Sequence, residues 1–159
     1  MNRNHLGDMM RLCSRREYCT EDIRHKLQLR QLEPDSINEI IKTLTEEGYL
    51  SDSRYASAFA RDKSSLQGWG SAKIKLALHR KGIDAETIRD AMTEIDAKEA
   101  AKKLKTVLEI KHKSLIKEDL RKNNCTAPDA SRLYTIKNKL VRFGISRGYS
   151  IDEILASMP

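Results

Sequence analysis

The strongest constraint on the fold is that the chain repeats itself at an offset of 51 residues, although few residues are identical. Seven large apolar residues recur in register, while the polar residues between them change. This pattern indicates one supersecondary unit that is built twice. The matched positions are Tyr18, Ile23, Leu27, Leu32, Ile37, Ile41 and Leu44, which fall on Trp69, Ile74, Leu78, Ile83, Ile88, Met92 and Ile95.

A third, imperfect copy follows near the C-terminus. Its landmark is Arg147-Gly148-Tyr149, which aligns with Lys81-Gly82-Ile83, and Gly144 stands where the second copy has Leu78. Short repeats bury their apolar faces against neighbours and leave an extended outer surface free, so the pattern favours a protein that binds over one that catalyses. The remaining matches join Leu140 to Ile74, Ile154 to Ile88 and Met158 to Met92.

The apolar periodicity predicts helices throughout the chain and strands nowhere. Ile37, Ile40, Ile41 and Leu44 occupy positions i, i+3, i+4 and i+7, which lie on one face of a helix. Residues that commonly begin and end helices flank such segments. Candidate N-caps are Thr20, Asp35 or Ser36, Asp52, Asp84 and Ser150, and candidate stops are Gly48, Gly82 and Gly148.

These signals predict nine helices in three sets of three. Leu115, Ile116 and Leu120 could extend the seventh helix, but the run from Asn123 to Pro128 breaks helices, and we expect a mobile loop near 114–129. The predicted fold is all-α, an elongated tandem array of three three-helix repeats with helix-turn-helix-like units. The repeats are 1–50, 51–95 and 96–159, the last with a basic seventh helix. The helices are expected at roughly 4–15, 20–31, 35–47, 52–66, 71–80, 84–95, 96–113, 130–147 and 150–157.

Composition and motifs argue against several classes of protein. No apolar run approaches the roughly 20 residues of a membrane span, and the N-terminal residues lack a signal-peptide core, so we expect a cytoplasmic protein. The three cysteines show no metal-binding spacing and are expected to be reduced thiols. The four histidines are scattered, and Gly68-Trp69-Gly70 lacks the lysine of a phosphate loop. We therefore expect no catalytic residue, no metal and no cofactor.

The positive charge is concentrated in the last third of the chain. Residues 1–50 carry 8 Lys/Arg against 9 Asp/Glu, residues 51–95 carry 8 against 6, and residues 96–159 carry 14 against 8. The net charge therefore rises from −1 through +2 to +6. This distribution suits an anionic partner, such as nucleic acid or an acidic protein surface, but a solvated lysine-rich helix explains it equally well.

Several residue blocks, in the same order, resemble the RecX family of regulatory proteins. They cover nearly the whole chain, from about Leu6 to Met158. The blocks are Ser14-Arg15-Arg16-Glu17-Tyr18-Cys19-Thr20-Glu21, Glu47-Gly48-Tyr49-Leu50-Ser51-Asp52-Ser53-Arg54-Tyr55-Ala56, Lys81-Gly82-Ile83-Asp84, Lys139-Leu140-Val141-Arg142-Phe143 and Ser146-Arg147-Gly148-Tyr149-Ser150.

The resemblance implies a non-catalytic modulator of the RecA recombinase, with a place in DNA repair by homologous recombination and in the SOS response. RecX proteins are three-helix repeat proteins that dock in the groove of the RecA filament on single-stranded DNA and contact more than one protomer. They mainly inhibit ATP hydrolysis and strand exchange. The chain departs from the family pattern at Gly144, and its basic tract 98–122 matches no motif of the family.

The aromatic residues allow two interpretations. Tyr18 and Trp69 occupy equivalent repeat positions, which favours a shared packing anchor over platforms for stacking unpaired bases. Tyr55 and Phe59 share a helix face at i, i+4 and are expected to pack, whereas Arg54 lies off that face. The last helix of each of the first two sets exposes mixed charges, which argues against reading of the major groove of duplex DNA.

A discontinuous basic stripe is the candidate partner or DNA site. We expect charge reversal of Lys73 and Lys75 to weaken filament binding without lowering thermal stability. The expected partner is RecA and its filament on single-stranded DNA, with weak direct DNA binding, and the protein is expected to be monomeric. The alternatives are a protein that acts directly on single- or double-stranded DNA and a general interaction scaffold. The stripe comprises Arg15, Arg16, Arg24, Lys26, Arg30, Arg54, Arg61, Lys63, Lys73, Lys75, Arg80, Lys81, Lys137, Lys139, Arg142 and Arg147.

Overall fold

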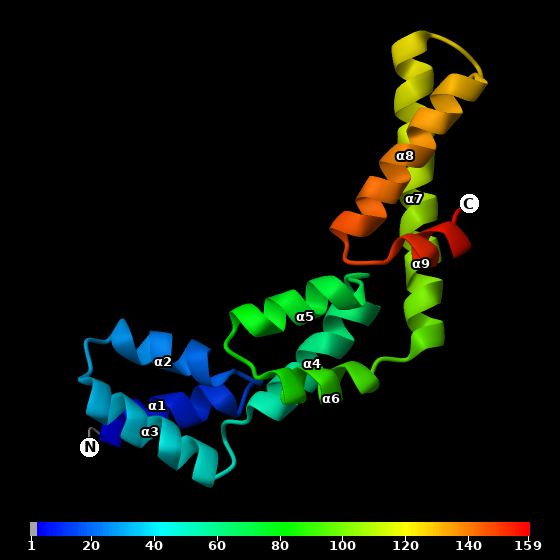
Figure 1. Cartoon of the computed structure of the whole chain (residues 1–159). Helices are drawn as coiled ribbons and strands as arrows, with labels where there is room; N and C mark the ends of the chain where they lie inside the picture. The colour runs from blue at the N-terminus through cyan, green and yellow to red at the C-terminus, as the bar shows by residue number, and fades with distance from the viewer. Residues whose placement is uncertain (1–2) are drawn as a thin grey trace. The chain divides into compact units, whose positions relative to one another are not determined.

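The computed structural model describes residues 3–159, so Met1 and Asn2 of the predicted first repeat lie outside it. Within residues 3–159 the chain forms nine α-helices and no strand, which confirms the all-α prediction (Figure 1). The helices are α1 (Arg3–Cys13), α2 (Thr20–Gln28), α3 (Pro34–Glu46), α4 (Asp52–Ser65), α5 (Ser71–Arg80), α6 (Ala85–Thr93), α7 (Ala97–Asn123), α8 (Ala130–Ser146) and α9 (Ile151–Ala156).

The predicted mobile loop at 114–129 is wrong over most of its length. Helix α7 continues to Asn123, where Asn124 adopts a left-handed conformation with φ 46°. The apolar face explains the extension, because Leu115 is buried in one cluster with Leu104 and Leu108. Burial of that face outweighs the polar sequence around it, and only the short segment 124–129 separates α7 from α8.

The chain divides into two compact units, and the division runs through α4 and α5. One unit contains the chain up to Ala60 together with Lys75–Glu94. The other contains Arg61–Ile74 and Ile95–Pro159. The predicted repeat boundaries at 50/51 and 95/96 stay a prediction.

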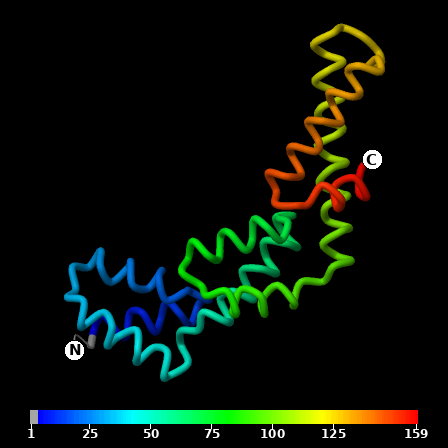
Figure 2. The backbone as a smooth tube through the Cα atoms, viewed as in Figure 1, coloured from blue at the N-terminus to red at the C-terminus, as the bar shows by residue number. Residues whose placement is uncertain are grey.

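One hydrophobic core of the first unit lies between its first three helices. Helix α3 packs against both α1 and α2 (Figure 2). The apolar positions that define the first repeat point into this core, as their register predicts. The buried cluster contains Met9, Tyr18, Ile23, Leu27, Ile37, Ile40, Ile41, Leu44 and Leu50.

The core of the second unit forms where α8 runs back alongside α7 and meets α9 (Figure 1). Leu140 and Ile154, which match Ile74 and Ile88 of the second copy, are both buried here. The register of the third copy is therefore confirmed by burial. The cluster contains Leu104, Leu108, Leu115, Ile136, Leu140, Tyr149 and Ile154.

The turn after the second helix of each set has the same geometry in all three copies. A residue with positive φ ends the helix, and the next amide donates to a carbonyl five residues earlier, as in a Schellman motif. This equivalence confirms both alignments at the level of the backbone. The left-handed residues are Gln31, Gly82 and Gly148, with φ of 60°, 73° and 91°. The amide-to-carbonyl bonds are Leu32 to Leu27 (3.4 Å), Ile83 to Leu78 (3.3 Å) and Tyr149 to Gly144 (3.2 Å).

The predicted helix caps are correct at two positions and wrong at three. Asp84 and Ser150 accept from the backbone N–H groups of Thr87 and Glu153, as expected. Helix α2 is capped by the Sγ of Cys19 instead of Thr20. Asp52 does not cap α4, because it is the first residue of the helix and the Oγ of Ser51 accepts the backbone N–H of Arg54 at 3.2 Å. Oδ1 of Asp52 instead accepts the backbone N–H of Thr20 at 2.7 Å. The sequence did not reveal this bond, since its partners lie 32 residues apart.

The predicted cap of α3 at Asp35 or Ser36 is also wrong. Glu33 holds the N-cap position without a side-chain hydrogen bond, and Pro34 begins the helix. Proline is favoured at the first helical position because its missing N–H has no partner there in any helix.

Candidate functional site

Two of the candidate basic residues lie against the Tyr18 ring in the first unit. The Arg16 guanidinium lies 4.5 Å from the centre of the Tyr18 ring, and the Lys26 Nζ lies 5.4 Å from it. Together with Lys81 they line a hollow of about 320 Å³. The Tyr18 side chain belongs to the buried core and is only 8% exposed, which supports the packing interpretation over base stacking.

Lys81 is held by an ion pair. Its Nζ lies 2.5 Å from Oδ1 of Asp22, so α5 is tied to α2. Burial is the largest single influence and raises the pKa of Asp22, but the hydrogen bonds with Lys81 and Cys19 and the charge of Lys81 together outweigh it, so the net pKa is lowered. The same hydrogen bond raises the pKa of Lys81. The pair stays ionised at neutral pH, and much of the Lys81 charge is compensated within the fold.

Three other candidate arginines also hold the first unit together. Arg24 donates to the amide oxygen of Asn38 at 2.8 Å and so joins α2 to α3. Arg30 pairs with Asp8 at 2.8 Å. Arg54 pairs with Glu17 at 2.9 Å and also donates to the Gly48 carbonyl. These contacts give the three arginines a structural role.

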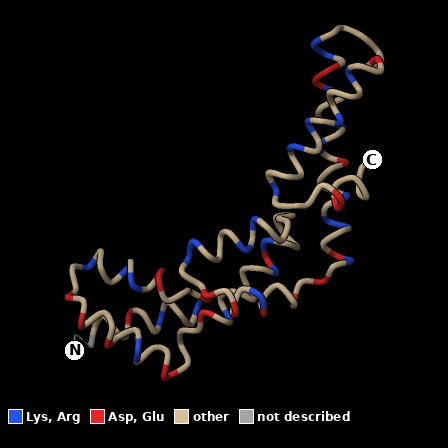
Figure 3. Tube along the Cα trace, in the orientation of Figure 1, with Lys and Arg blue, Asp and Glu red and all other residues tan. Residues whose placement is uncertain are grey.

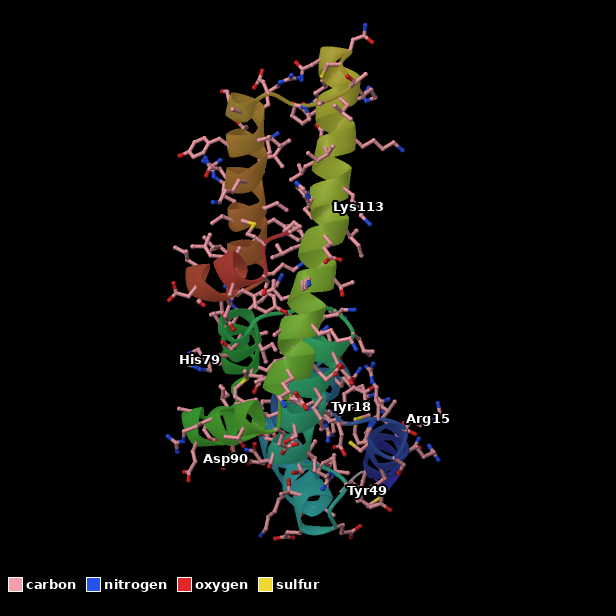
Figure 4. The ribbon with its side chains drawn as sticks, turned by 90° about the vertical axis from the view of Figure 1, so that its right-hand side faces the viewer. Arg15, Tyr18, Tyr49, His79, Asp90 and Lys113 are labelled. Atoms are coloured by element: carbon pink, nitrogen blue, oxygen red, sulfur yellow. The ribbon has the colours of Figure 1, made fainter. Side chains whose placement is uncertain are left out.

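Arg15, Lys75 and Arg80 of the first unit expose their side chains to solvent and belong to none of the ion pairs and ring contacts described above. Figure 4 labels Arg15, which extends outward beyond the end of α1. An exposed cation is able to meet an anionic partner without breaking an internal ion pair first. Within the first unit these three are therefore the better candidates for contact.

The second unit places two candidate lysines over Trp69. Nζ of Lys63 lies 4.8 Å from the ring centre and Nζ of Lys73 lies 4.4 Å from it. Trp69 is half-buried. Stacking of a nucleic-acid base on Trp69 would compete with these ammonium groups for the faces of the ring.

Arg147 joins two turns that lie far apart in the sequence. Its Nη1 donates to the Gln67 carbonyl at 2.6 Å, and its own carbonyl accepts the N–H of Gly70 at 2.7 Å. A Cβ on Gly70 would lie 2.3 Å from the backbone of Gly148, so only glycine allows this approach. Arg147 therefore has a structural role in the second unit, which the sequence did not reveal.

Phe143 is a second aromatic centre that sequence reasoning missed. Nζ of Lys111 lies 5.5 Å from its ring centre, and the Arg147 guanidinium lies 5.1 Å from it. Lys111 belongs to the basic tract 98–122, which matched no motif. Its meeting with Phe143 depends on the pairing of α7 with α8, for which the sequence carries no local signal.

Helix α8 presents the most accessible candidate charges of the second unit. Lys137, Lys139 and Arg142 are all exposed. Figure 3 shows Lys and Arg recurring along α7 and α8 with few acidic residues between them. The candidates thus fall into two groups, with Arg61, Lys63, Lys73, Lys137, Lys139, Arg142 and Arg147 in the second unit and the other nine in the first. Their alignment in one continuous stripe stays a prediction.

Among residues 3–159 no group of three or more His, Cys, Asp or Glu side chains is placed to hold a metal ion. All three cysteines are free, as their number and spacing predict. Burial raises the pKa of the Cys19 thiol to about 11, which disfavours the reactive thiolate. None of the helices in this part of the chain is long and apolar enough to cross a membrane.

The fold and its surfaces define an all-α protein built from tandem three-helix sets. Residues 51–92 match the family model for the second three-helix domain of RecX. Regulatory protein RecX of Clostridium botulinum (strain Eklund 17B / Type B) is 37% identical over 134 residues, which cover 84% of this chain and 57% of that protein. Its namesake in Clostridium perfringens (strain SM101 / Type A) is 32% identical over 136 residues, which cover 85% and 58%. The chain belongs to the RecX family, and it spans a little under three fifths of the length of these relatives.

Two solved structures share the fold. The crystal structure of RecX from Lactobacillus salivarius superimposes with a TM-score of 0.74 at 23% identity, over 97% of this chain and 92% of that one. A crystal structure of regulatory protein RecX gives the same TM-score at 21% identity, over 94% of this chain and 68% of that one. At these identities the likeness concerns the fold.

Proposed function

We propose that this protein regulates a RecA-type recombinase by binding the filament that the recombinase forms on single-stranded DNA. The proposal depends mainly on one observation, which is that relatives named regulatory protein RecX match 84–85% of the chain at 32–37% identity. In this proposal the protein acts in the cytoplasm, as a monomer and without a catalytic step of its own. Its main effect is to inhibit ATP hydrolysis and strand exchange.

The exposed cations of α8 supply the attraction to the filament in this proposal. A filament on DNA carries phosphates and acidic side chains, so its field draws a positively charged surface toward it. Lys137, Lys139 and Arg142 are exposed. Charge reversal of Lys73 is a less specific test of binding, because Nζ of Lys73 lies over Trp69. The substitution would remove that contact and could change the stability of the protein as well.

Direct binding to DNA is the second candidate function. The half-buried Trp69 with two lysines beside its ring favours it, since aromatic and basic side chains together are typical of surfaces that hold single strands. A base that stacks on Trp69 would have to displace an ammonium group from the ring. The two candidates differ in their dependence on salt. Binding through phosphates weakens steeply as salt rises, with a log–log slope of about −0.7 for each phosphate contact on single strands. Contacts with a protein groove retain a component that salt does not weaken.

The test compares binding to naked single-stranded DNA with binding to the same DNA coated by the recombinase, across a range of salt concentrations. We expect tighter and more salt-resistant binding to the coated DNA. Lys137→Glu with Arg142→Glu should weaken it about tenfold without lowering thermal stability. The matched control is Lys98→Glu with Lys117→Glu, which makes the same charge change at exposed positions of α7. Equal binding to naked and coated DNA, with the same steep salt slope, would support the direct DNA function instead.

A further inference from the structure

An apolar groove with a basic rim lies between α5 and α6 in the first unit. Its volume is about 580 Å³. Leu76, Ile88 and Met92 supply its apolar lining, and every ionisable side chain that lines it is basic. These rim residues are Lys75, His79 and Arg89. Figure 4 labels His79 on α5, and Asp90 marks α6, the other helix of the groove.

In the first helix set, a side-chain hydrogen bond bridges the two helices that correspond to α5 and α6. At the offset of 51 residues, Lys75 and Arg89 correspond to Arg24 and Asn38. Arg24 donates to Oδ1 of Asn38 at 2.8 Å and so bridges α2 and α3. Lysine and arginine side chains carry only donors and like charges, so Lys75 and Arg89 are unable to form that bridge. The groove between α5 and α6 therefore lacks the side-chain hydrogen bond that bridges α2 and α3 in the first set.

The apolar lining also reaches the solvent. Leu76 is 49% exposed, whereas the equivalent residue of the first set is His25. A large exposed leucine beside a half-buried methionine is unfavourable in water and is stabilised when another apolar group covers it. Together with the volume of the groove, this exposure indicates room for side chains that belong to another molecule.

From these features we infer that the α5–α6 groove binds an acidic amphipathic helix of a partner protein. Apolar side chains of that helix enter between Leu76 and Met92, and its carboxylates pair with Lys75 and Arg89. A groove between two helices suits a helical ligand that presents anchors at i, i+3 or i+4, and i+7. Helix α5 has 10 residues and is about 15 Å long, which accommodates two to three turns of the ligand.

The inference stands apart from the proposed regulation of a recombinase. It requires no DNA, and it makes no use of the α8 cations. Each proposal therefore fails or succeeds in its own experiment. An acidic helix is favoured over nucleic acid here because the lining is apolar, whereas phosphate contacts need the cationic groups alone.

Two fluorescent peptides of about 14 residues test the inference on the full chain. Both carry leucines at i, i+3, i+4 and i+7, and their remaining positions are alanine with glutamate in one peptide and lysine in the other. We expect fluorescence anisotropy to show at least about tenfold tighter binding of the glutamate peptide. Amide chemical-shift changes should concentrate in Ser71–Arg80 and Ala85–Thr93.

Matched variants locate the contact. Lys75→Glu with Arg89→Glu should weaken the glutamate peptide about tenfold, and Leu76→Ser should weaken both peptides. The control is Lys102→Glu with Lys105→Glu, an equal charge change on exposed residues of α7, which should leave both affinities unchanged. The inference is overturned if the glutamate peptide does not bind. It is also overturned if the control variant loses as much affinity for this peptide as Lys75→Glu with Arg89→Glu does. Three further results would overturn it. One is tighter binding of the lysine peptide, and another is self-association of the protein through the groove. The third is displacement of the glutamate peptide by single-stranded DNA that shifts the same amide signals.

Discussion

Gly144 lies directly against Ile154, so closely that a Cβ on Gly144 would be 2.6 Å from Cδ1 and Cγ1 of the isoleucine. The repeat alignment gives Gly144 the position that Leu78 fills in the second copy. The third set thus has a glycine where the second has a leucine, and this leaves room for Ile154 of α9 against α8. Ile154 is fully buried as a result. The glycine at this position, which departs from the family pattern, therefore allows Ile154 to pack against α8.

Replacement of Gly144 by alanine should destabilise the protein by about 1–3 kcal/mol, because the added methyl group overpacks the contact with Ile154. The matched control is Gly7→Ala in α1, where a Cβ meets nothing within 4 Å. Alanine there should stabilise the protein by about 0.5–1 kcal/mol through helix propensity alone. Urea denaturation of both variants measures the difference, and stabilisation by both substitutions would contradict the packing described here.

Replacement of Gln31 by glycine should make the folded protein more stable. Gln31 is the only member of the three equivalent turn positions that is not glycine, and its φ is 60°. Gln31→Gly should stabilise the protein by about 1 kcal/mol, since glycine adopts this conformation without steric cost. Gln31→Ala keeps the Cβ and serves as the control. Equal effects of the two substitutions on the free energy of unfolding would show that the left-handed turn is not strained.

The ion pair between Asp22 and Lys81 should make stability depend on pH on the acid side. The pKa of Asp22 is lowered in the folded protein, below about 3.9 in the unfolded chain. Its contribution is therefore present above about pH 4 and is lost as the pH falls through the folded pKa. Asp22→Asn should cost about 0.5–1 kcal/mol at pH 6, because the pair is partly exposed, and less at pH 3.

Denaturation at pH 6 and at pH 3 measures this effect. The exposed Asp90→Asn makes the same chemical change in the same unit and serves as the control. The gap between wild type and Asp22→Asn should narrow at pH 3, while the gap for Asp90→Asn changes little. A constant cost of Asp22→Asn at both pH values would mean that the carboxylate charge does not contribute.

Tyr149 should tolerate loss of its hydroxyl group. In the part of the chain that the structure describes, this buried hydroxyl has no hydrogen-bond partner. A buried donor without a partner costs about 1–3 kcal/mol, so Tyr149→Phe should leave the protein equally stable or stabilise it. Tyr149→Ala should instead cost about 3 kcal/mol, since it empties a buried position. Thermal unfolding of both variants checks the pair, and a clear loss in Tyr149→Phe would point to a bound water or other partner.

The regular parts of the fold were predictable because they depend on local signals. The spacing of Ile37, Ile40, Ile41 and Leu44 predicted α3, and Gly82 and Gly148 predicted two of the three equivalent helix ends. The left-handed Gln31 at the third was not predicted, because it is not glycine. The apolar residues near Leu115 allowed an extension of α7, but the sequence did not favour it over a loop, because burial of Leu115 depends on α8, whose pairing the sequence does not encode locally.

The candidate site was less predictable for the same reason. The sequence identified the basic residues but not their partners. Arg54 binds Glu17 across 37 positions, and Lys81 binds Asp22 across 59. Only the folded chain separates such structural cations from exposed ones such as Lys137. The α5–α6 groove likewise requires two helices to be seen together.

The central proposal is that this protein acts on a recombinase filament, and DNA-dependent ATP hydrolysis tests it most directly. The recombinase from the same organism is held on saturating single-stranded DNA and titrated with this protein. The account predicts that hydrolysis falls at substoichiometric ratios and that additional DNA does not restore it. Unchanged hydrolysis, or inhibition that excess DNA relieves, would contradict regulation through the filament.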